Sequence, residues 1–303
     1  MSYLSLKFSG YNKKRLRFVY SMLIPIIGWM FIFNIFPILY AFYLSLFQRG
    51  IMGIGEMKFV GFVNYGKALF DDEMFWFSFK NTLYYVSLIC TIHLLLAFFV
   101  ALGLHKVTRR YRSLLVIFYF SPIVIGMVVG AVIFSYLYDP NVGLFNTILT
   151  FFGLPRLYYL TQPSIALPSL FIVNVWLYLG FDAVIFLAAL QNIPQDLYNS
   201  ARVDGANSWQ TMLYITLPLM KPIALFLLIT TFVGSFQIFS LVWMLTPDGG
   251  PLNSTTVLML YIYNTAFQYY RINYACALTY IMFMVTLAIT MVQLKIGRSS
   301  WQY

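Results

Sequence analysis

The sequence predicts an all-α membrane protein with six transmembrane helices. Of the 303 residues, 61% are hydrophobic and only 9% are charged, whereas about a quarter of the residues in a soluble domain are charged. The apolar residues gather in six long runs, and each has the roughly 20 residues that an α-helix needs to cross a bilayer. We expect these spans at residues 19–46, 80–104, 113–138, 164–190, 223–246 and 275–296.

The spans are expected to form a single domain over residues 19–303, preceded by a basic segment at 1–18. Neither an internal repeat nor a low-complexity linker suggests a second domain. The first apolar run is too long for the hydrophobic region of a removable signal peptide, so we expect it to form the first span. Pro25 and Pro37 are expected to kink this span, which helix bundles tolerate when neighbours satisfy the freed backbone groups.

The basic residues predict that both termini face the cytoplasm, because cytoplasmic segments of membrane proteins collect Lys and Arg. With the N-terminus inside, 13 of the 19 basic residues fall on the inner side and 6 on the outer side. This topology also accounts for the net charge of +10, so the charge does not indicate a nucleic-acid partner. The inner residues are Lys7, Lys13, Lys14, Arg15, Arg17, Lys106, Arg109, Arg110, Arg112, Arg202, Lys221, Lys295 and Arg298, and the outer ones are Arg49, Lys58, Lys67, Lys80, Arg156 and Arg271.

Residues 194–222, between the fourth and fifth spans, are the one long polar interruption between two strongly apolar segments. Gly205 can take the positive φ that ends a helix, and small residues surround it. Ser208 is a plausible N-cap for a second helix, which Pro218 and Pro222 would end or kink. The sequence therefore predicts a cytoplasmic helix–turn–helix, termed the knob below.

The knob resembles the EAA loop of permease subunits in bacterial ABC importers. The family pattern is E-A-A, three further residues, G-A, and later L-P; here these positions read Asn199-Ser200-Ala201, Gly205-Ala206 and Leu217-Pro218. Asn199 replaces the usual Glu, and Ser200 replaces the first Ala. The resemblance implies that the knob docks on an ATPase subunit. The coupling residues would be Asn199, Ser200, Ala201, Asp204, Gly205, Ala206, Trp209, Met212 and Pro218.

Three further segments resemble signatures of maltose-type permeases. Val60-Gly61 with Asn64-Tyr65, and then Asn81-Thr82-Leu83, are similar to the earlier signatures. The turn cluster Thr246–Pro251 resembles a Gly-Gly-Pro loop that is commoner in the larger partner of such permease pairs. The resemblance therefore covers most of the chain after about residue 60.

The resemblance implies a permease subunit of a type I ABC importer for carbohydrates in the bacterial cytoplasmic (inner) membrane. Its expected partners are a second homologous permease, a dimer of ABC ATPases and an extracytoplasmic solute-binding protein. ATP and Mg²⁺ would bind to the ATPases, so no cofactor is expected in this chain. Alternating access would move a sugar or oligosaccharide through the spans.

Asp182 is the only acid predicted deep in a span, where an ionisable side chain is costly and usually faces a cavity or a partner. Asn174 and Tyr178 precede it at helical spacing, and Thr231 and Ser235 form a second stripe after the knob. Aromatic planes and hydrogen-bonding groups suit sugars, and the resemblance places the sugar between the helices that flank the EAA loop. Ordinary interhelical hydrogen bonding is the alternative. The candidate substrate path is Asn174, Tyr178, Phe181, Asp182, Thr231, Ser235 and Gln237.

The remaining patterns predict packing rather than chemistry. Residues 61–68 nearly spell a phosphate-binding P-loop, but Ala68 replaces the hydroxyl that would bind magnesium, so we expect no ATP binding there. Gly126 and Gly130 form a G-x-x-x-G pattern, which predicts close helix packing. No catalytic set or metal site is expected, and the isolated candidates are assigned to packing: His93, His105, Cys90 and Cys276.

Two other classes of membrane protein fit the sequence less well than an importer. A secondary transporter needs coupling-ion groups inside the membrane, and only Asp182 is available for that role. A membrane-embedded enzyme needs a catalytic set, and none is apparent in the sequence.

Overall fold

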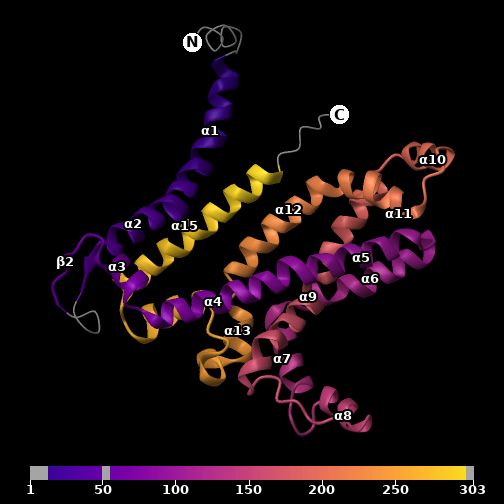
Figure 1. Ribbon diagram of the computed structural model, residues 1–303. Helices are drawn as coiled ribbons and strands as arrows, with labels where there is room; N and C mark the ends of the chain where they lie inside the picture. The colour runs from indigo at the N-terminus through magenta and orange to yellow at the C-terminus, as the bar shows by residue number, and fades with distance from the viewer. Residues whose placement is uncertain (1–12, 50–54, 298–303) are drawn as a thin grey trace. The chain divides into compact units, whose positions relative to one another are not determined.

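The computed structural model describes residues 13–49 and 55–297, and this part of the chain is mostly helical (Figure 1). The described residues divide into two units. The first holds the residues up to Lys67 together with Thr265–Tyr280, and the second holds Ala68–Asn264 and the residues from Ile281 onward. Residues 1–12 of the expected basic segment lie outside the described residues.

The first unit begins with a long apolar helix. It runs from α1 (Lys13–Met30) through a π-helical turn (Phe31–Ile35) into α2 (Phe36–Ser45). Pro25 lies inside α1 and Pro37 lies in the first turn of α2. The π-helical turn stands between them, where a wider turn accommodates the backbone bonds that proline cannot make.

A short hairpin and α3 (Val63–Phe70) are attached to the end of α2. Strand β1 (Phe47–Gln48) pairs antiparallel with β2 (Lys58–Phe59). The side-chain amide of Asn64 in α3 donates to the carbonyl oxygens of Ser45 and Phe47, at 2.8 and 2.9 Å. The signature residue Asn64 therefore holds α3 against the end of α2.

The first residues of α15 (Ile272–Gly297) complete this unit. The Asn273 amide donates to the carbonyl oxygen of Leu44 at 2.9 Å, and the Tyr280 hydroxyl donates to that of Ile38 at 2.6 Å. These bonds join two apolar helices that lie far apart in the sequence.

The second unit holds the remaining elements. In chain order they are α4 (Glu73–Leu88), a π-helical turn (Ile89–His93), α5 (Leu94–Lys106), α6 (Arg109–Ile125), α7 (Met127–Leu137), α8 (Leu144–Phe151), α9 (Pro163–Gln191), α10 (Gln195–Val203), α11 (Ser208–Thr211), a π-helical turn (Met212–Thr216), α12 (Leu217–Phe236), α13 (Ser240–Leu245), two 3₁₀ turns (Pro247–Gly249 and Pro251–Asn253), α14 (Leu258–Tyr263) and a π-helical turn (Asn264–Gln268) that leads into the first unit.

Helix α9 is the centre of the second unit and packs against α5 and α6. Ala183 and Phe186 on α9 are buried in one apolar cluster with Ala97 and Ala101 on α5. Gly180 lies against the Tyr119 backbone of α6, where a β-carbon would collide with that backbone. Small residues thus let these helices approach closely, as membrane helices commonly do.

Five described helices are long and apolar enough to cross a membrane, and a sixth span requires counting a bent pair as one. The predicted third span, 113–138, is wrong as a single straight helix. Helices α6 and α7 meet at Gly126 at an angle of 98°, and Gly126 takes φ +80°. Gly130 does lie in a close contact, since a β-carbon there would come 2.9 Å from Leu177. Of the two glycines, one breaks the helix and the other packs.

The predicted fifth span, 223–246, is also displaced. The helix starts at Ser208, runs without a break to Phe236, and the chain then turns before α13. Of the two expectations for Pro218 and Pro222, that they would end the second helix of the knob or kink it, the first is wrong. Pro218 falls in the first turn of α12, and the π-helical turn just before it loosens the bonding that proline interrupts.

Candidate functional site

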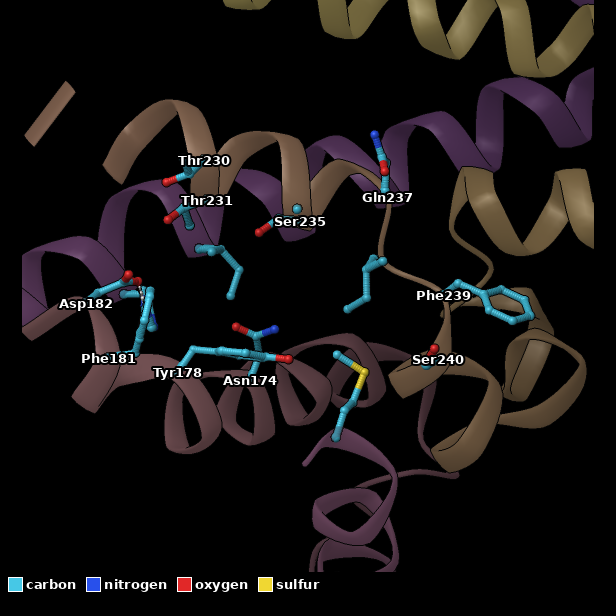
Figure 2. Close-up of a pocket in the computed structure, with 15 residues that line it drawn as sticks. Asn174, Tyr178, Phe181, Asp182, Thr230, Thr231, Ser235, Gln237, Phe239 and Ser240 are labelled. Carbon is cyan, nitrogen blue, oxygen red and sulfur yellow. Dashed lines mark hydrogen bonds and ion pairs between the residues drawn. The ribbon is translucent and has the colours of Figure 1, made fainter. Parts of the chain in front are cut away.

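A cavity of about 380 Å³ lies inside the second unit, between α9 and α12. All seven residues that the sequence singled out as a substrate path line it, so the structure brings them together (Figure 2). Its walls also include the π-helical turn after α4, the first residue of α7 and the turn between α12 and α13. The residues that sequence reasoning missed are Ile89, His93, Met127, Thr230, Gly234, Ile238, Phe239 and Ser240.

The α9 wall carries Asn174, Tyr178 and Asp182, which fall on one face because they are spaced by four residues. Thr231 and Ser235 on α12 face them across the cavity (Figure 2). The cavity therefore offers amide and hydroxyl groups from two helices together with an aromatic ring. This combination can hydrogen-bond to hydroxyl edges and cover an apolar face.

His93 is the partner of Asp182. The Nε2 atom of His93 lies 2.7 Å from the Oδ2 atom of Asp182, and both side chains are buried. The carboxylate accepts, so Nε2 carries the donated proton, and Nδ1 has no hydrogen-bond partner among the described residues. The sequence did contain a signal, because a lone acid and a lone His both lie deep in spans and buried charges are usually paired.

The far end of the cavity is formed by a break in the fifth span. Helix α12 ends at Phe236, Phe239 takes a non-helical conformation, and α13 starts at Ser240. The Phe239 ring packs against Trp243 and Tyr263, with centroids 5.7 and 4.8 Å apart. Membrane proteins tolerate irregular backbone of this kind where it lines a cavity.

The knob has the local geometry that the sequence predicts at its turn. Gly205 takes φ +77°, its N–H donates to the carbonyl oxygen of Arg202, and the N–H of Ala206 donates to that of Ala201. These two bonds form a Schellman motif, in which a glycine ends a helix. Helix α10 therefore ends at Val203 with Asp204 as its C-cap, and the chain turns into α11.

The predicted N-cap of the second knob helix is wrong by one residue. Asn207, not Ser208, occupies that position. Its side chain accepts from the N–H of Gln210 at 2.8 Å, and the Gln210 side chain accepts from the N–H of Asn207 at 2.8 Å. This reciprocal capping box satisfies two helix-end donors, whereas Ser208 would satisfy one.

Most of the predicted coupling residues lie on the surface of the knob. Ala201 is the exception, because its side chain is buried. Large apolar side chains are strongly exposed there, among them Val203 at 88% and the coupling residue Trp209 at 69%. The sequence reasoning missed Val203. The exposed coupling residues are Asn199, Ser200, Asp204, Gly205, Trp209 and Pro218, and Ala206 and Met212 are half-buried.

The knob is tied to the start of the fifth span. The Tyr198 hydroxyl on α10 lies 3.2 Å from the Thr216 hydroxyl in the π-helical turn before α12. Both residues also border a cavity of about 320 Å³ beneath the knob. A displacement of α10 can therefore be transmitted to α12, which carries one wall of the α9–α12 cavity.

The Gly-Gly-Pro loop forms a fixed structure with the Asn81-Thr82 signature. The Asn81 amide donates to the carbonyl oxygens of Asn253 and Thr256, at 3.3 and 3.1 Å. The Thr82 hydroxyl accepts from the N–H of Leu258 at 2.8 Å. The two signatures therefore meet in space.

The P-loop-like stretch does not form a phosphate-binding loop. Residues Val63–Phe70 form α3, so the backbone N–H groups are engaged in a helix rather than free to cradle a phosphate.

Comparison with known proteins identifies the family. The family model described as "Binding-protein-dependent transport system inner membrane component" matches residues 8–296. The chain belongs to this family. The resemblance to permease subunits of bacterial ABC importers is thereby confirmed, and the chain is a multi-span component of the inner membrane.

Individual relatives of this permease span nearly its whole length. The lactose transport system permease protein LacF of Rhizobium radiobacter is 32% identical over 279 residues, which cover 90% of this chain and 92% of LacF. The trehalose/maltose transport system permease protein MalF of Thermococcus litoralis is 32% identical over 282 residues, which cover 92% of this chain and 93% of MalF.

A solved structure has the same fold. It is a bacterial alginate ABC transporter in complex with an alginate pentasaccharide-bound periplasmic protein. One of its chains matches this permease with a TM-score of 0.83 and 30% sequence identity, over 94% of this chain and 95% of that chain.

Proposed function

We propose that this permease moves a sugar or oligosaccharide across the inner membrane by alternating access through the α9–α12 cavity. The observation that carries the proposal is the convergence of Asn174, Tyr178, Thr231 and Ser235 on one cavity of about 380 Å³. Sugar rings present apolar faces and hydroxyl edges, which the aromatic and hydrogen-bonding side chains of this cavity match. The names of relatives that transport lactose and trehalose or maltose support a carbohydrate substrate.

The preferred sugar is uncharged. No Lys or Arg is among the described residues that line the cavity, and Asp182 is its one carboxylate. A sugar acid would bring a second carboxylate beside Asp182 with no Lys or Arg to offset it, because the one basic group of the lining, His93, is already paired with Asp182. Like charges repel strongly where water is scarce. A second solved structure of similar fold is a bacterial ABC transporter involved in the import of the acidic polysaccharide alginate, and it would then differ from this permease in substrate charge.

The knob is the element that couples transport to ATP hydrolysis. Val203 and Trp209 present apolar surface to a partner, and the Tyr198–Thr216 contact links that surface to α12.

ATP and Mg²⁺ would bind to a dimer of ABC ATPases, and a second homologous permease and a solute-binding protein would complete the importer. The knob and both termini would face the cytoplasm. The bent pair α6–α7 would count as one of six spans. Residues 19–303 would act as one permease domain, and the family model covers nearly all of them.

The test is uptake by vesicles that contain the complete importer and receive the solute-binding protein. We expect uptake of an uncharged oligosaccharide to require ATP, and a uronic-acid oligosaccharide of the same length to be transported poorly. Uptake driven by an ion gradient without ATP would instead identify a secondary transporter. Faster uptake of the uronic acid would overturn the proposed charge preference but not the importer assignment.

A further inference from the structure

The first unit contains a cavity of its own, of about 270 Å³, with a positively charged rim. Arg49, Lys67 and Arg271 line it, and all three side chains are exposed. It shares no residue with the translocation cavity. The P-loop-like stretch contributes Lys67, which the proposed transport function leaves without a role.

The three cations have no acidic partner in the part of the chain that the structure describes. Among the described residues, the contact within 4 Å between a basic and an acidic side chain joins His93 and Asp182, in the other unit. The contact found for Lys67 among the described residues is a cation–π contact, with its Nζ atom 5.4 Å from the centroid of the Tyr274 ring. Three positive side chains around one cavity repel one another, and a bound anion would remove that repulsion.

The floor of the cavity is polar and fixed. Asn64, Asn273 and Tyr274 are 5, 8 and 7% exposed. The Asn64 and Asn273 amides donate to carbonyl oxygens at the end of α2, which holds α3 and α15 in place. Helix α15 starts at Ile272, so the positive end of its dipole lies at the cavity and adds to the attraction for an anion.

The cavity lies where two membrane helices end. The helix that runs from Leu16 stops at Ser45, and α15 starts at Ile272, so this region is at the boundary between membrane and water. Tyr43 and Tyr270 are exposed there, at 50 and 58%, as is typical of the aromatic belt at headgroup depth. Phospholipid phosphates occupy the same depth.

We propose that this cavity binds the phosphate of an anionic phospholipid such as phosphatidylglycerol. Arg side chains bind phosphate oxygens through two N–H groups at once, and a Lys supplies a further charge. Basic pockets between membrane helices bind anionic headgroups by this chemistry. The lipid would hold the ends of α2 and α15 together at the membrane surface.

The test is a native mass spectrometry titration of the purified importer with dioleoylphosphatidylglycerol and with dioleoylphosphatidylcholine. We expect tighter binding of phosphatidylglycerol. Lys67→Gln and Arg271→Gln should each weaken it about fivefold, since one basic side chain near an anionic lipid contributes on that scale. Lys67→Arg should keep it. Arg156→Gln is the matched control, because Arg156 is exposed and lies outside the cavity.

The outcomes separate the lipid from other anions. The proposal is supported if Lys67→Gln and Arg271→Gln bind phosphatidylglycerol more weakly while Arg156→Gln binds it as before. Each variant should still hydrolyse ATP. Equal affinity of all variants for phosphatidylglycerol overturns it. Displacement of the lipid by inorganic phosphate at low excess would assign the cavity to a free anion instead. Loss of binding to the solute-binding protein, with lipid affinity intact, would assign the cations to that protein.

Discussion

His93 and Asp182 pair across two elements that lie 89 residues apart in the sequence, with His93 Nε2 2.7 Å from Asp182 Oδ2. His93 ends the π-helical turn between α4 and α5, and Asp182 lies in α9. Each would be costly alone inside the membrane, and each satisfies the other. The pair therefore fixes one Asp182 oxygen and joins two helices at the edge of the α9–α12 cavity.

The two members of this pair are expected to respond unequally to mutation. Asp182→Asn keeps an oxygen that can accept from His93 Nε2–H, so the free energy of unfolding should fall by only about 1 kcal/mol. His93→Leu leaves a buried carboxylate unpaired and should cost about 3 kcal/mol or more. Denaturation of the permease by SDS in detergent micelles measures both.

The double variant His93→Leu/Asp182→Leu is the control for that comparison. Removing both partners leaves no unpaired charge, so it should be less destabilised than His93→Leu alone. Strictly additive costs would show that the two side chains do not interact in the folded protein.

The stripe on α9 could be predicted because a helix has a fixed period. Asn174, Tyr178 and Asp182 must share a face wherever the helix lies. The His93 pairing could not be predicted in this way, because it depends on how α4 and α5 pack on α9. The π-helical turn just before α5 also shifts the phase of the helix.

Two glycines also show where prediction from the sequence stops. Gly205 has a polar neighbourhood and no span to continue, so its role as a helix end could be predicted and is confirmed by φ +77°. Gly126 lies in an apolar run, where glycine either packs or breaks a helix. Only tertiary packing decides between them, and here it produces a 98° bend.

Loss of a polar group from the cavity wall should impair transport but not folding. Asn174→Leu or Tyr178→Ala is expected to weaken the apparent affinity for sugar about 5- to 150-fold, because an unpaired polar group typically costs about 1–3 kcal/mol. Basal ATP hydrolysis and assembly should survive. The measurement is the concentration dependence of uptake by vesicles.

Asn141→Leu is the matched control for this experiment. Asn141 is an exposed loop residue outside the cavity, so the same substitution should leave uptake unchanged. Unaltered kinetics in Asn174→Leu and Tyr178→Ala would mean that the stripe serves only interhelical packing.

The capping box predicts that Asn207, rather than Ser208, stabilises the start of the second knob helix. Asn207→Ala removes the acceptor for the Gln210 N–H and should destabilise the start of that helix by about 1 kcal/mol. Hydrogen exchange of residues 208–212 should then accelerate. Ser208→Ala should leave exchange unchanged, and the reverse result would return the cap to Ser208.

The turn after α7 is expected to depend on pH. Asp139 accepts from the N–H groups of Val142 and Asn141, and these bonds lower the pKa of its carboxyl group. A carboxyl group whose pKa is lowered by folding stabilises the turn above its unfolded pKa of about 3.9. That contribution is lost as the pH falls through the lower, folded value.

Protection factors from hydrogen exchange at Asn141 and Val142 report this change. They should be constant near neutral pH, begin to fall below about pH 4, and be lost once the pH passes the lower pKa of the carboxyl group in the folded turn. Asp139→Asn should lower the protection at neutral pH and remove most of its pH dependence. An unchanged profile in Asp139→Asn would show that the carboxylate does not hold the turn.

Gly205 allows the coupling role of the knob to be tested apart from its folding. Its φ is +77°, and a β-carbon there would meet no atom of the described residues within 4 Å. Gly205→Ala therefore introduces backbone strain of about 1–2 kcal/mol without filling contact space inside the chain. Gly205→Trp adds the same strain and a large side chain that projects toward the proposed ATPase. We expect Gly205→Ala to keep most ATP-dependent uptake and Gly205→Trp to lose it.

Gly153 is the matched control for this experiment. It takes φ +70°, and no neighbour in the described part of the chain lies within 4 Å of a β-carbon built there. It lies in the loop after α8, away from the knob in the sequence. Gly153→Trp should therefore carry the same strain and bulk without blocking the ATPase. The measurements are co-purification of the ATPase and ATP-dependent uptake. If Gly205→Trp and Gly153→Trp lose ATPase co-purification and ATP-dependent uptake to the same extent, backbone strain alone explains the loss. If Gly205→Trp binds the ATPase and transports normally, the knob is not the coupling element.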